Sequence, residues 1–200
     1  MAGPASVSEL MTVVGAEQSR LSNHLAMLRE RALVRTTRHG RQVIYELHDA
    51  AVARLVESLG QIGAAPTRTV ASAPVARART CYDHLAGRLG VALFEALVAR
   101  DALKAPDSVP GDVALGARGA RLFGTLRVDL DSARQERRRF ATACLDWAER
   151  RPHLGGALGA ALWAELVSRG WIVRRPGTRA VVLTAAGTRG LKRALGVALA

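Results

Sequence analysis

The stretch that most constrains the fold of this chain is residues 15–47, in which a helical pattern is followed directly by a strand pattern. Its apolar side chains recur at offsets of four, three and four residues, at Leu21, Leu25, Leu28 and Ala32. This spacing predicts an α-helix with one buried stripe, because residues three and four apart share a helix face. The opposite face carries short polar side chains and one arginine, which are groups that read base edges in a major groove.

A β-hairpin is predicted immediately after this helix. Residues 34–37 form its first strand, and residues 43–47, whose apolar side chains alternate, form its second. The tip between them is Arg38-His39-Gly40-Arg41, which places a glycine at the turn and cations around it. Such a tip is typical of a tight hairpin.

A shorter helix is predicted upstream, over residues 6–14. Ser6 and Glu9 have the spacing of a capping box, in which each side chain satisfies a backbone N–H at the start of a helix. Gly15 can adopt the left-handed conformation that ends a helix. The predicted order is therefore helix, tight turn, helix and hairpin, which is a winged helix-turn-helix. An ordinary α+β core unit with the same order is the alternative.

This part of the chain resembles the arsenic-repressor-like (ArsR/SmtB) family of bacterial transcription regulators. The resemblance covers about the first 60 residues and depends on three motifs. They are the VSEL opening, the run Gln18-Ser19-x-x-Ser22-x-His24-Leu25-x-x-Leu28, and the wing from Leu33-Val34 through His39-Gly40-Arg41 to Tyr45-x-Leu47.

The resemblance implies which residues contact double-stranded DNA. The residues that would read bases are Ser19, Arg20, Ser22 and Asn23. Those that would position the helix and the wing on phosphates are Gln18, His24, Arg38 and Arg41.

The resemblance also raises the question of the N-terminus. The family generally places one or two helices before the segment that begins here at Ser6, and this chain has only residues 1–5 in that position. Either the start was assigned too late in the reading frame, or the domain lacks these helices.

A further helix is expected after the wing, over residues 50–62, with Asp49 as its cap. In the family the helix at this place pairs with its two-fold mate, so the resemblance implies a homodimer that presents two reading heads to a palindromic site. Packing of this helix within the monomer is the alternative.

Residues 64–77 are predicted to form a linker, because small residues and two prolines dominate their composition. The linker would divide a DNA-binding domain at residues 1–63 from a C-terminal region at residues 78–200. Two hundred residues are enough for two domains that each have a core.

The C-terminal region contains an internal repeat, at about residues 81–130 and 150–200. His84–Arg100 aligns without a gap on His153–Arg169 at an offset of 69, and residues 113–119 align on residues 181–187 at an offset of 68. Each copy predicts a long helix, a strand, a turn, a strand and a short helix, again the order of a winged-helix unit. The predicted fold class is therefore mostly α with short β-hairpins (α+β).

Charge and composition limit the broader class. The formal net charge is +12, but residues 1–64 contribute only +1 of it, so charge by itself is weak evidence for DNA binding. No apolar run reaches the length of a membrane span, and the N-terminus lacks the pattern of a secretion signal. We therefore expect a cytoplasmic protein without a membrane partner, in which both cysteines are thiols.

We expect the C-terminal region to serve oligomerisation and sensing. Its glycines at positions 87, 90, 155, 156 and 159 indicate close contact between helices. Residues 131–147 are predicted to be helical, with an arginine run at 137–139 that either forms a solvated face or contacts phosphate.

The candidate sensor residues are Cys81, His84, Cys144 and His153. The thiol at 81 and the imidazole at 84 would be neighbours on one helical face, and basic Arg79 could lower the pKa of the thiol. Three interpretations stay open: buried structural residues, a thiol redox or electrophile sensor, and a site for a metal or small molecule in which Asp83 and Asp146 could take part.

No metal site can be assigned through the resemblance. The sites known in the family use cysteines in the first helix of the helix-turn-helix, or Asp, His and Glu on the dimer helix. Here residues 5–11 contain no cysteine, and residues 50–62 offer only Glu57. No cofactor is therefore predicted, and the effector is an unknown small molecule, metal or redox signal.

The sequence thus predicts a homodimeric transcription regulator, a repressor that an effector or thiol modification releases from DNA. A winged-helix adaptor that binds other proteins is the alternative. No enzyme is predicted, because the chain has no Gly-rich phosphate loop, no serine-elbow motif and no carboxylate pair with an obvious cleft.

Overall fold

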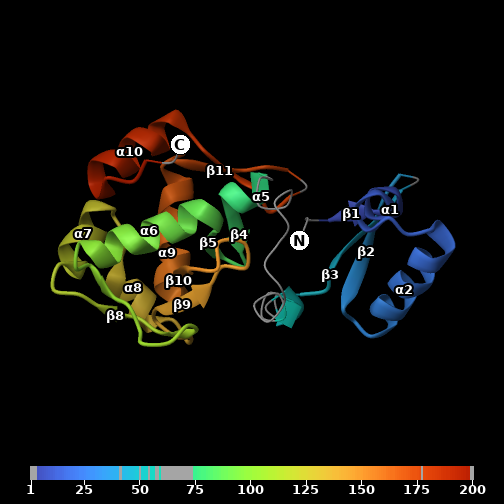
Figure 1. Cartoon of the computed structure of the whole chain (residues 1–200), viewed down its shortest axis with the longest axis horizontal. Coiled ribbons are helices and arrows are strands. Elements are labelled where there is room, and N and C mark those ends of the chain that lie inside the picture. The colour runs from blue at the N-terminus through green and yellow to red at the C-terminus, as the bar shows by residue number, and fades with distance from the viewer. Residues whose placement is uncertain are drawn as a thin grey trace.

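Figure 1 shows the fold of the chain in a computed structural model. The structure describes residues 4–40, 42–49, 51–53, 55–56, 59, 74–176 and 178–198. Arg41, most of the predicted linker and much of the predicted helix at 50–62 lie outside the described residues. Among the helices described here, none is both long and apolar enough to cross a membrane.

The N-terminal part is a winged helix-turn-helix, as the sequence predicts. Its elements are β1 (Ala5–Ser6), α1 (Val7–Val14), α2 (Gln18–Glu30), β2 (Val34–His39) and β3 (Gln42–Leu47). The strands form an antiparallel sheet in the order β1-β3-β2. The sequence did not predict β1, because two residues are too few to show an alternating pattern.

Both ends of α1 have the predicted caps. The Ser6 hydroxyl accepts a hydrogen bond from the Glu9 backbone N–H at 3.3 Å, and the Glu9 carboxylate accepts one from the Ser6 backbone N–H at 2.7 Å. Gly15 ends the helix with a φ of 66°. The capping box and the glycine cap are therefore confirmed.

The apolar stripe of α2 is shorter than predicted. Leu21 and Leu25 are buried, but Leu28 is 37% exposed. Ala32 lies beyond the end of the helix, in a turn with a φ of 53°. The prediction was wrong at Ala32, because the chain turns there toward β2.

The wing is longer than predicted. Strands β2 and β3 pair over six positions, so that Arg38 lies opposite Val43 and His39 lies opposite Gln42. Arg38 and His39 therefore belong to a strand and not to the tip. Gly40 has a φ of 60°, a conformation that favours glycine at a tight turn.

The C-terminal region contains two sets of elements in the same order: hairpin, long helix, strand pair and helix (Figure 1). The first set is β4 (Arg79–Cys81), β5 (His84–Ala86), α6 (Gly87–Ala99), β6 (Leu103–Lys104), β8 (Ala114–Leu115) and α7 (Gly119–Thr125). The second is β9 (Thr142–Leu145), β10 (Pro152–Gly155), α9 (Gly156–Ser168), β11 (Ile172–Arg174), β12 (Val181–Leu183) and α10 (Ala185–Leu195). The other described elements are α5 (Pro74–Arg77), β7 (Gly111–Asp112) and α8 (Leu130–Gln135).

The two long helices supply much of the core of this region. Leu89 and Leu97 of α6 and Leu158 and Leu166 of α9 are at most 1% exposed. The core cluster extends from Ala78 to Val197 and has no member in the described part of the winged helix.

Two helix predictions in this region were wrong. The stretch from Cys81 to His84 was predicted to be helical, but the long helices begin at Gly87 and Gly156, and the histidines at 84 and 153 lie in strands. The helix predicted over residues 131–147 ends at Gln135, and β9 follows it.

The two sets are interlocked by helix-to-strand packing. Helix α6 packs on β10, α9 packs on β5, and the two strands contact each other. A Cβ at Gly90 would lie 2.4 Å from the Leu85 carbonyl oxygen, and one at Gly159 would lie 2.5 Å from that of Leu154. These two glycines therefore serve contact between helix and strand, and not the predicted contact between helices.

Candidate functional site

The exposed face of α2 is the first candidate surface. The predicted DNA-facing residues of this helix are all exposed: Gln18, Ser19, Arg20, Ser22, Asn23 and His24. Leu21 and Leu25 are buried on the opposite side and fix the helix on the rest of the unit. Polar side chains can therefore approach a ligand without a change in the core.

The wing adds exposed cations beside this helix. Arg38 is exposed in β2, while Arg41 lies outside the described residues. The Nε of Arg35 donates a hydrogen bond to Glu46 Oε1 at 3.0 Å, so part of the charge of Arg35 is neutralised across the wing.

The four candidate sensor residues form one cluster in the C-terminal region. Cys81 lies opposite His84 across the β4–β5 hairpin, and Cys144 lies opposite His153 across the β9–β10 hairpin. One ligand atom from each of the four lies within 4.8 Å of the others. The prediction that Cys81 and His84 share a helical face was wrong, because cross-strand pairing makes them neighbours.

The two histidines at this cluster are buried and stacked. The imidazole of His84 is 5.2 Å from that of His153 between ring centroids, with 28° between the planes. His84 Nε2 and both ring nitrogens of His153 have no hydrogen-bond partner among the described residues. Buried polar atoms without partners are uncommon in proteins, so these three need an explanation.

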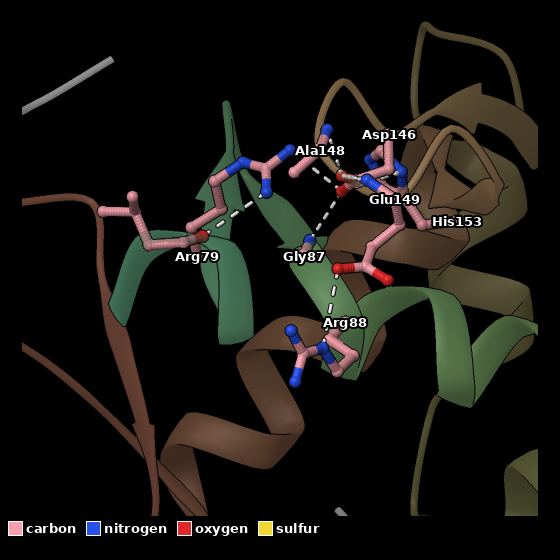
Figure 2. Close-up of polar contacts among 8 residues, drawn as sticks. Arg79, Gly87, Arg88, Asp146, Ala148, Glu149 and His153 are labelled. Atoms are coloured by element: carbon pink, nitrogen blue, oxygen red, sulfur yellow. Dashed lines mark hydrogen bonds and ion pairs between the residues drawn. The ribbon is translucent and has the colours of Figure 1, made fainter. Parts of the chain in front are cut away.

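Asp146 organises the backbone beside the cluster (Figure 2). This fully buried carboxylate accepts hydrogen bonds from Arg79 Nη2 at 2.9 Å and from the Gly87 backbone N–H at 2.7 Å. It also accepts from the backbone N–H groups of Ala148 and Glu149 at 2.9 and 3.0 Å. Burial would raise the pKa of Asp146, but the Arg79 charge and these donors lower it, so the carboxylate stays ionised.

Asp146 and Asp83 each lie beside one histidine of the cluster. Asp83 Oδ1 is 3.3 Å from His84 Nδ1, and Asp146 Oδ2 is 3.9 Å from His153 Nδ1, which is longer than a hydrogen bond. The sequence identified both aspartates as candidate ligands, but it gave no sign that Asp146 holds the start of α6.

The arginine run is largely engaged in ion pairs. Arg138 pairs with Asp83 and Glu136, and Arg139 Nε donates to Asp112 Oδ1 at 2.7 Å. These two arginines are already neutralised by carboxylates within the chain. Their contacts therefore give no support to the phosphate-contact interpretation.

The pKa of the Cys81 thiol is shifted in the opposite direction to the prediction. The neighbouring Cys144 thiol and burial raise the pKa of Cys81 to about 11, against the effect of the nearby imidazoles. The Arg79 guanidinium does not lower it, because that group is directed to Asp146. Neutral thiols are poor nucleophiles, so this environment does not activate Cys81.

The pKa of the neighbouring His84 is also shifted. Burial would lower the pKa of His84, but contacts with Asp83 and Cys81 raise it to about 9.

Comparisons with known proteins identify relatives of both parts of the chain. Residues 1–36 match the family described as bacterial regulatory protein, arsR family. The chain is 37% identical over 196 residues to the uncharacterized HTH-type transcriptional regulator YdfF of Bacillus subtilis (strain 168), a match that covers 94% of this chain and 84% of that protein.

Two shorter matches fall within other regulators. One is the HTH-type transcriptional regulator NmtR of Mycobacterium tuberculosis (strain ATCC 25618 / H37Rv), 42% identical over 55 residues, which are 28% of this chain and 46% of NmtR. The other is the biofilm growth-associated repressor of Agrobacterium fabrum (strain C58 / ATCC 33970), 41% identical over 64 residues, which are 32% of this chain and 55% of the repressor.

Proposed function

The chain belongs to the ArsR family of bacterial transcription regulators, which are not enzymes, and we propose a function on that basis. The chain is a homodimeric, sequence-specific DNA-binding repressor, and an effector releases it from DNA. The observation that carries this proposal is the exposed polar face of α2, opposite buried Leu21 and Leu25. A helix fixed in this way can enter the major groove with its polar side chains toward the bases.

Each exposed residue has a proposed role. Arg20 is suited to guanine, because a guanidinium can donate two hydrogen bonds to the O6 and N7 atoms of that base. Ser19, Ser22 and Asn23 are short donors and acceptors that read neighbouring base edges. Phosphate contacts are assigned to Gln18, His24, Arg38 and Arg41.

The proposed dimer is supported by apolar side chains that the monomer leaves exposed. None of the residues of α1, all of which the structure describes, is buried, and Val13 and Val14 are 76% and 62% exposed. Leu55 and Leu59, within the predicted dimer helix, are 54% and 58% exposed. We infer that a second copy of the chain covers part of this surface, because exposed apolar patches of this kind mark protein interfaces. The dimer would present two copies of α2 to a palindromic site.

The proposed effector region is residues 78–200, joined to the winged helix by a linker at residues 64–77. The common order of elements and the matching glycines at positions 90 and 159 support the proposal that this region arose by duplication. Seven residues of α6 and six of α9 are buried, and neither helix offers the polar face that a groove requires. We therefore assign this region to sensing, in a protein that works in the cytoplasm.

The experiment that tests this function measures binding of the purified chain to the DNA upstream of its own gene, by fluorescence anisotropy across a salt series. Arg20→Ala should lose about 1–3 kcal/mol of discrimination against the wrong base at one position of each half-site. Arg41→Ala should weaken all sites alike and reduce the salt slope by about one.

Matched variants control for loss of charge alone. Arg29→Ala removes an exposed arginine from the last turn of α2, and Arg35→Ala removes one that pairs with Glu46 in the wing. Neither should alter sequence preference. Equal sequence preference in Arg20→Ala and the unmodified chain would reject the proposed reading face, and no DNA binding at any salt concentration would favour a protein-interaction adaptor.

A further inference from the structure

The buried histidines of the C-terminal region have no part in the proposed DNA contacts, yet their burial costs free energy. His84 and His153 are 8% and 1% exposed, and three of their four ring nitrogens have no hydrogen-bond partner among the described residues. A polar group that is buried without a partner loses its hydration and gains nothing in return. A ligand that accepts a nitrogen lone pair from each ring would remove this cost at one nitrogen of each histidine.

The neighbours of these nitrogens identify the class of ligand. We propose that Cys81, His84, Cys144 and His153 together bind one borderline or soft divalent metal ion of the zinc class. Two thiolates and two imidazoles are a set that such ions prefer, whereas calcium and magnesium require oxygen ligands. In a tetrahedral zinc site, bonds of about 2.0–2.3 Å place the ligand atoms about 3.3–3.8 Å apart. The four atoms here already lie within 4.8 Å of one another, so closure needs shifts of about 1 Å.

The carboxylates beside the cluster orient its histidines for this role. Asp83 lies beside Nδ1 of His84, and Asp146 lies on the Nδ1 side of His153. In the proposed site each histidine binds the ion through Nε2, the ring nitrogen away from its aspartate. Histidines that bind metals commonly direct their other ring nitrogen to a carboxylate, which fixes the tautomer and makes the ligand more basic. In Figure 2, Asp146 and His153 lie side by side.

The two halves of the region place the ligands symmetrically. Each hairpin contributes one thiol and one imidazole as a cross-strand pair. A Cβ at Gly90 of α6 would lie 3.5 Å from His153 Cβ, and one at Gly159 of α9 would lie 3.2 Å from His84 Cβ. Each long helix thus packs, at a glycine, against the histidine of the other hairpin. The ion would lie where the two halves meet.

The contacts favour metal binding over the other two interpretations of the cluster. Thiol sensing requires an accessible thiol, but Cys81 is only 5% exposed. Thiol chemistry also gives no reason for histidines without partners. A purely structural role would explain burial, but it would leave the same three nitrogens unsatisfied.

Bound metal would join the β4–β5 hairpin to the β9–β10 hairpin. All four ligands come from the protein, which is the arrangement of structural and regulatory sites, while catalytic sites keep one position for water. Cys144 is half-buried, so an ion from solvent can reach the cluster at this residue. In the proposed repressor this ion is the effector, and this part of the inference depends on the proposed function. Metal binding at the cluster does not depend on the proposed function.

The direct test is titration of the full, reduced chain with cobalt(II), followed by displacement with zinc. The reductant keeps both cysteines as thiols. We expect one equivalent of cobalt to produce the visible absorption of a tetrahedral ion together with near-ultraviolet thiolate-to-metal charge transfer. Zinc should then remove both signals.

Variants locate the site. Cys144→Ser should lose charge-transfer intensity and bind cobalt far more weakly, whereas His39→Asn changes an exposed histidine of β2 and should leave the titration unchanged. Asp83→Asn keeps all four ligands and should weaken zinc binding about 10–100-fold, as expected for a residue that positions a ligand.

A stability measurement covers the case in which a variant folds poorly. The three tryptophans at positions 147, 163 and 171 all lie in the C-terminal region, so their fluorescence reports its unfolding in urea. Zinc should raise the midpoint for the unmodified chain and for His39→Asn, and it should not raise it for Cys144→Ser. No charge-transfer band in the unmodified chain, or an identical titration in Cys144→Ser, would overturn the proposal. Either result would leave DNA binding, measured separately, unaffected.

Discussion

The winged helix and the C-terminal region place their polar chemistry in opposite ways. In the winged helix, α2 buries only two of its residues and its polar side chains face outward. In the C-terminal region, Arg79 and Asp146 are 0% exposed and two histidines are buried beside them. A surface can exchange contacts with a large partner such as DNA, whereas a buried cluster can hold only a small ligand. The difference fits the proposed division of roles, in which the winged helix recognises DNA and the C-terminal region senses the effector.

The largest expected effect in this comparison comes from Asp146→Ala. The substitution leaves the Arg79 charge buried without its acceptor and removes the partner of the Gly87 backbone N–H. Loss of one member of a buried ion pair typically costs about 3–5 kcal/mol, so the free energy of unfolding should fall by that amount. Urea denaturation followed by tryptophan fluorescence measures it.

Asp112→Ala is the matched control for this prediction. Asp112 also pairs with an arginine, Arg139, but its side chain is 75% exposed. Its removal should cost less than about 1 kcal/mol. Similar losses from the two substitutions would show that burial does not distinguish these ion pairs.

A smaller effect is expected when the interlocking of the two halves is disturbed. In Gly159→Ala the new Cβ would lie 2.5 Å from the Leu154 carbonyl oxygen of its own half and 3.2 Å from the His84 Cβ of the other half, so the helix and the strands must shift, at about 1–3 kcal/mol. Gly124→Ala places a Cβ in α7 with nothing within 4 Å and should stabilise the chain by about 0.4–1 kcal/mol. Thermal unfolding compares the two variants, and destabilisation by both would count against the close approach at Gly159.

The smallest effect is expected in the winged helix. Ser6→Ala removes the capping box of α1, a helix without buried residues, and should cost about 1 kcal/mol. Hydrogen exchange should show faster opening of the α1 amides, with no change in the urea transition reported by the tryptophans. Ser8→Ala, an exposed position inside the same helix, is the control and should leave exchange unchanged or slower. Unchanged exchange in Ser6→Ala would mean that contacts other than the cap hold α1.

The two regions also differ in how far their sequence predicted their structure. The winged helix could be predicted because its signals are local: Ser6 caps a helix through Glu9, three residues away, and Leu21 and Leu25 are one helical turn apart. Ala32 was misplaced because apolar spacing continues past the point at which the chain turns. The short strand β1 was missed because its pairing with β3 spans some forty residues of sequence.

The cluster could be predicted only as a set of candidate residues. Cys81 and Cys144 come together because two hairpins pack on each other, and no local pattern reports that contact. The stretch around Cys81 was interpreted as a helix, since its residues fit that periodicity as well as a short hairpin. Asp146 binds the backbone of Gly87 and the guanidinium of Arg79, and both contacts are tertiary.

The measurement that tests the central claim most directly is the affinity of the full chain for its upstream DNA, with zinc bound and with zinc removed by a chelator. If the buried cluster controls the exposed reading head, zinc-loaded protein should bind about 5–150-fold more weakly, the usual range for coupling between two sites. Cys144→Ser should bind equally well in both conditions. Equal affinity of the unmodified chain with and without zinc would contradict the account.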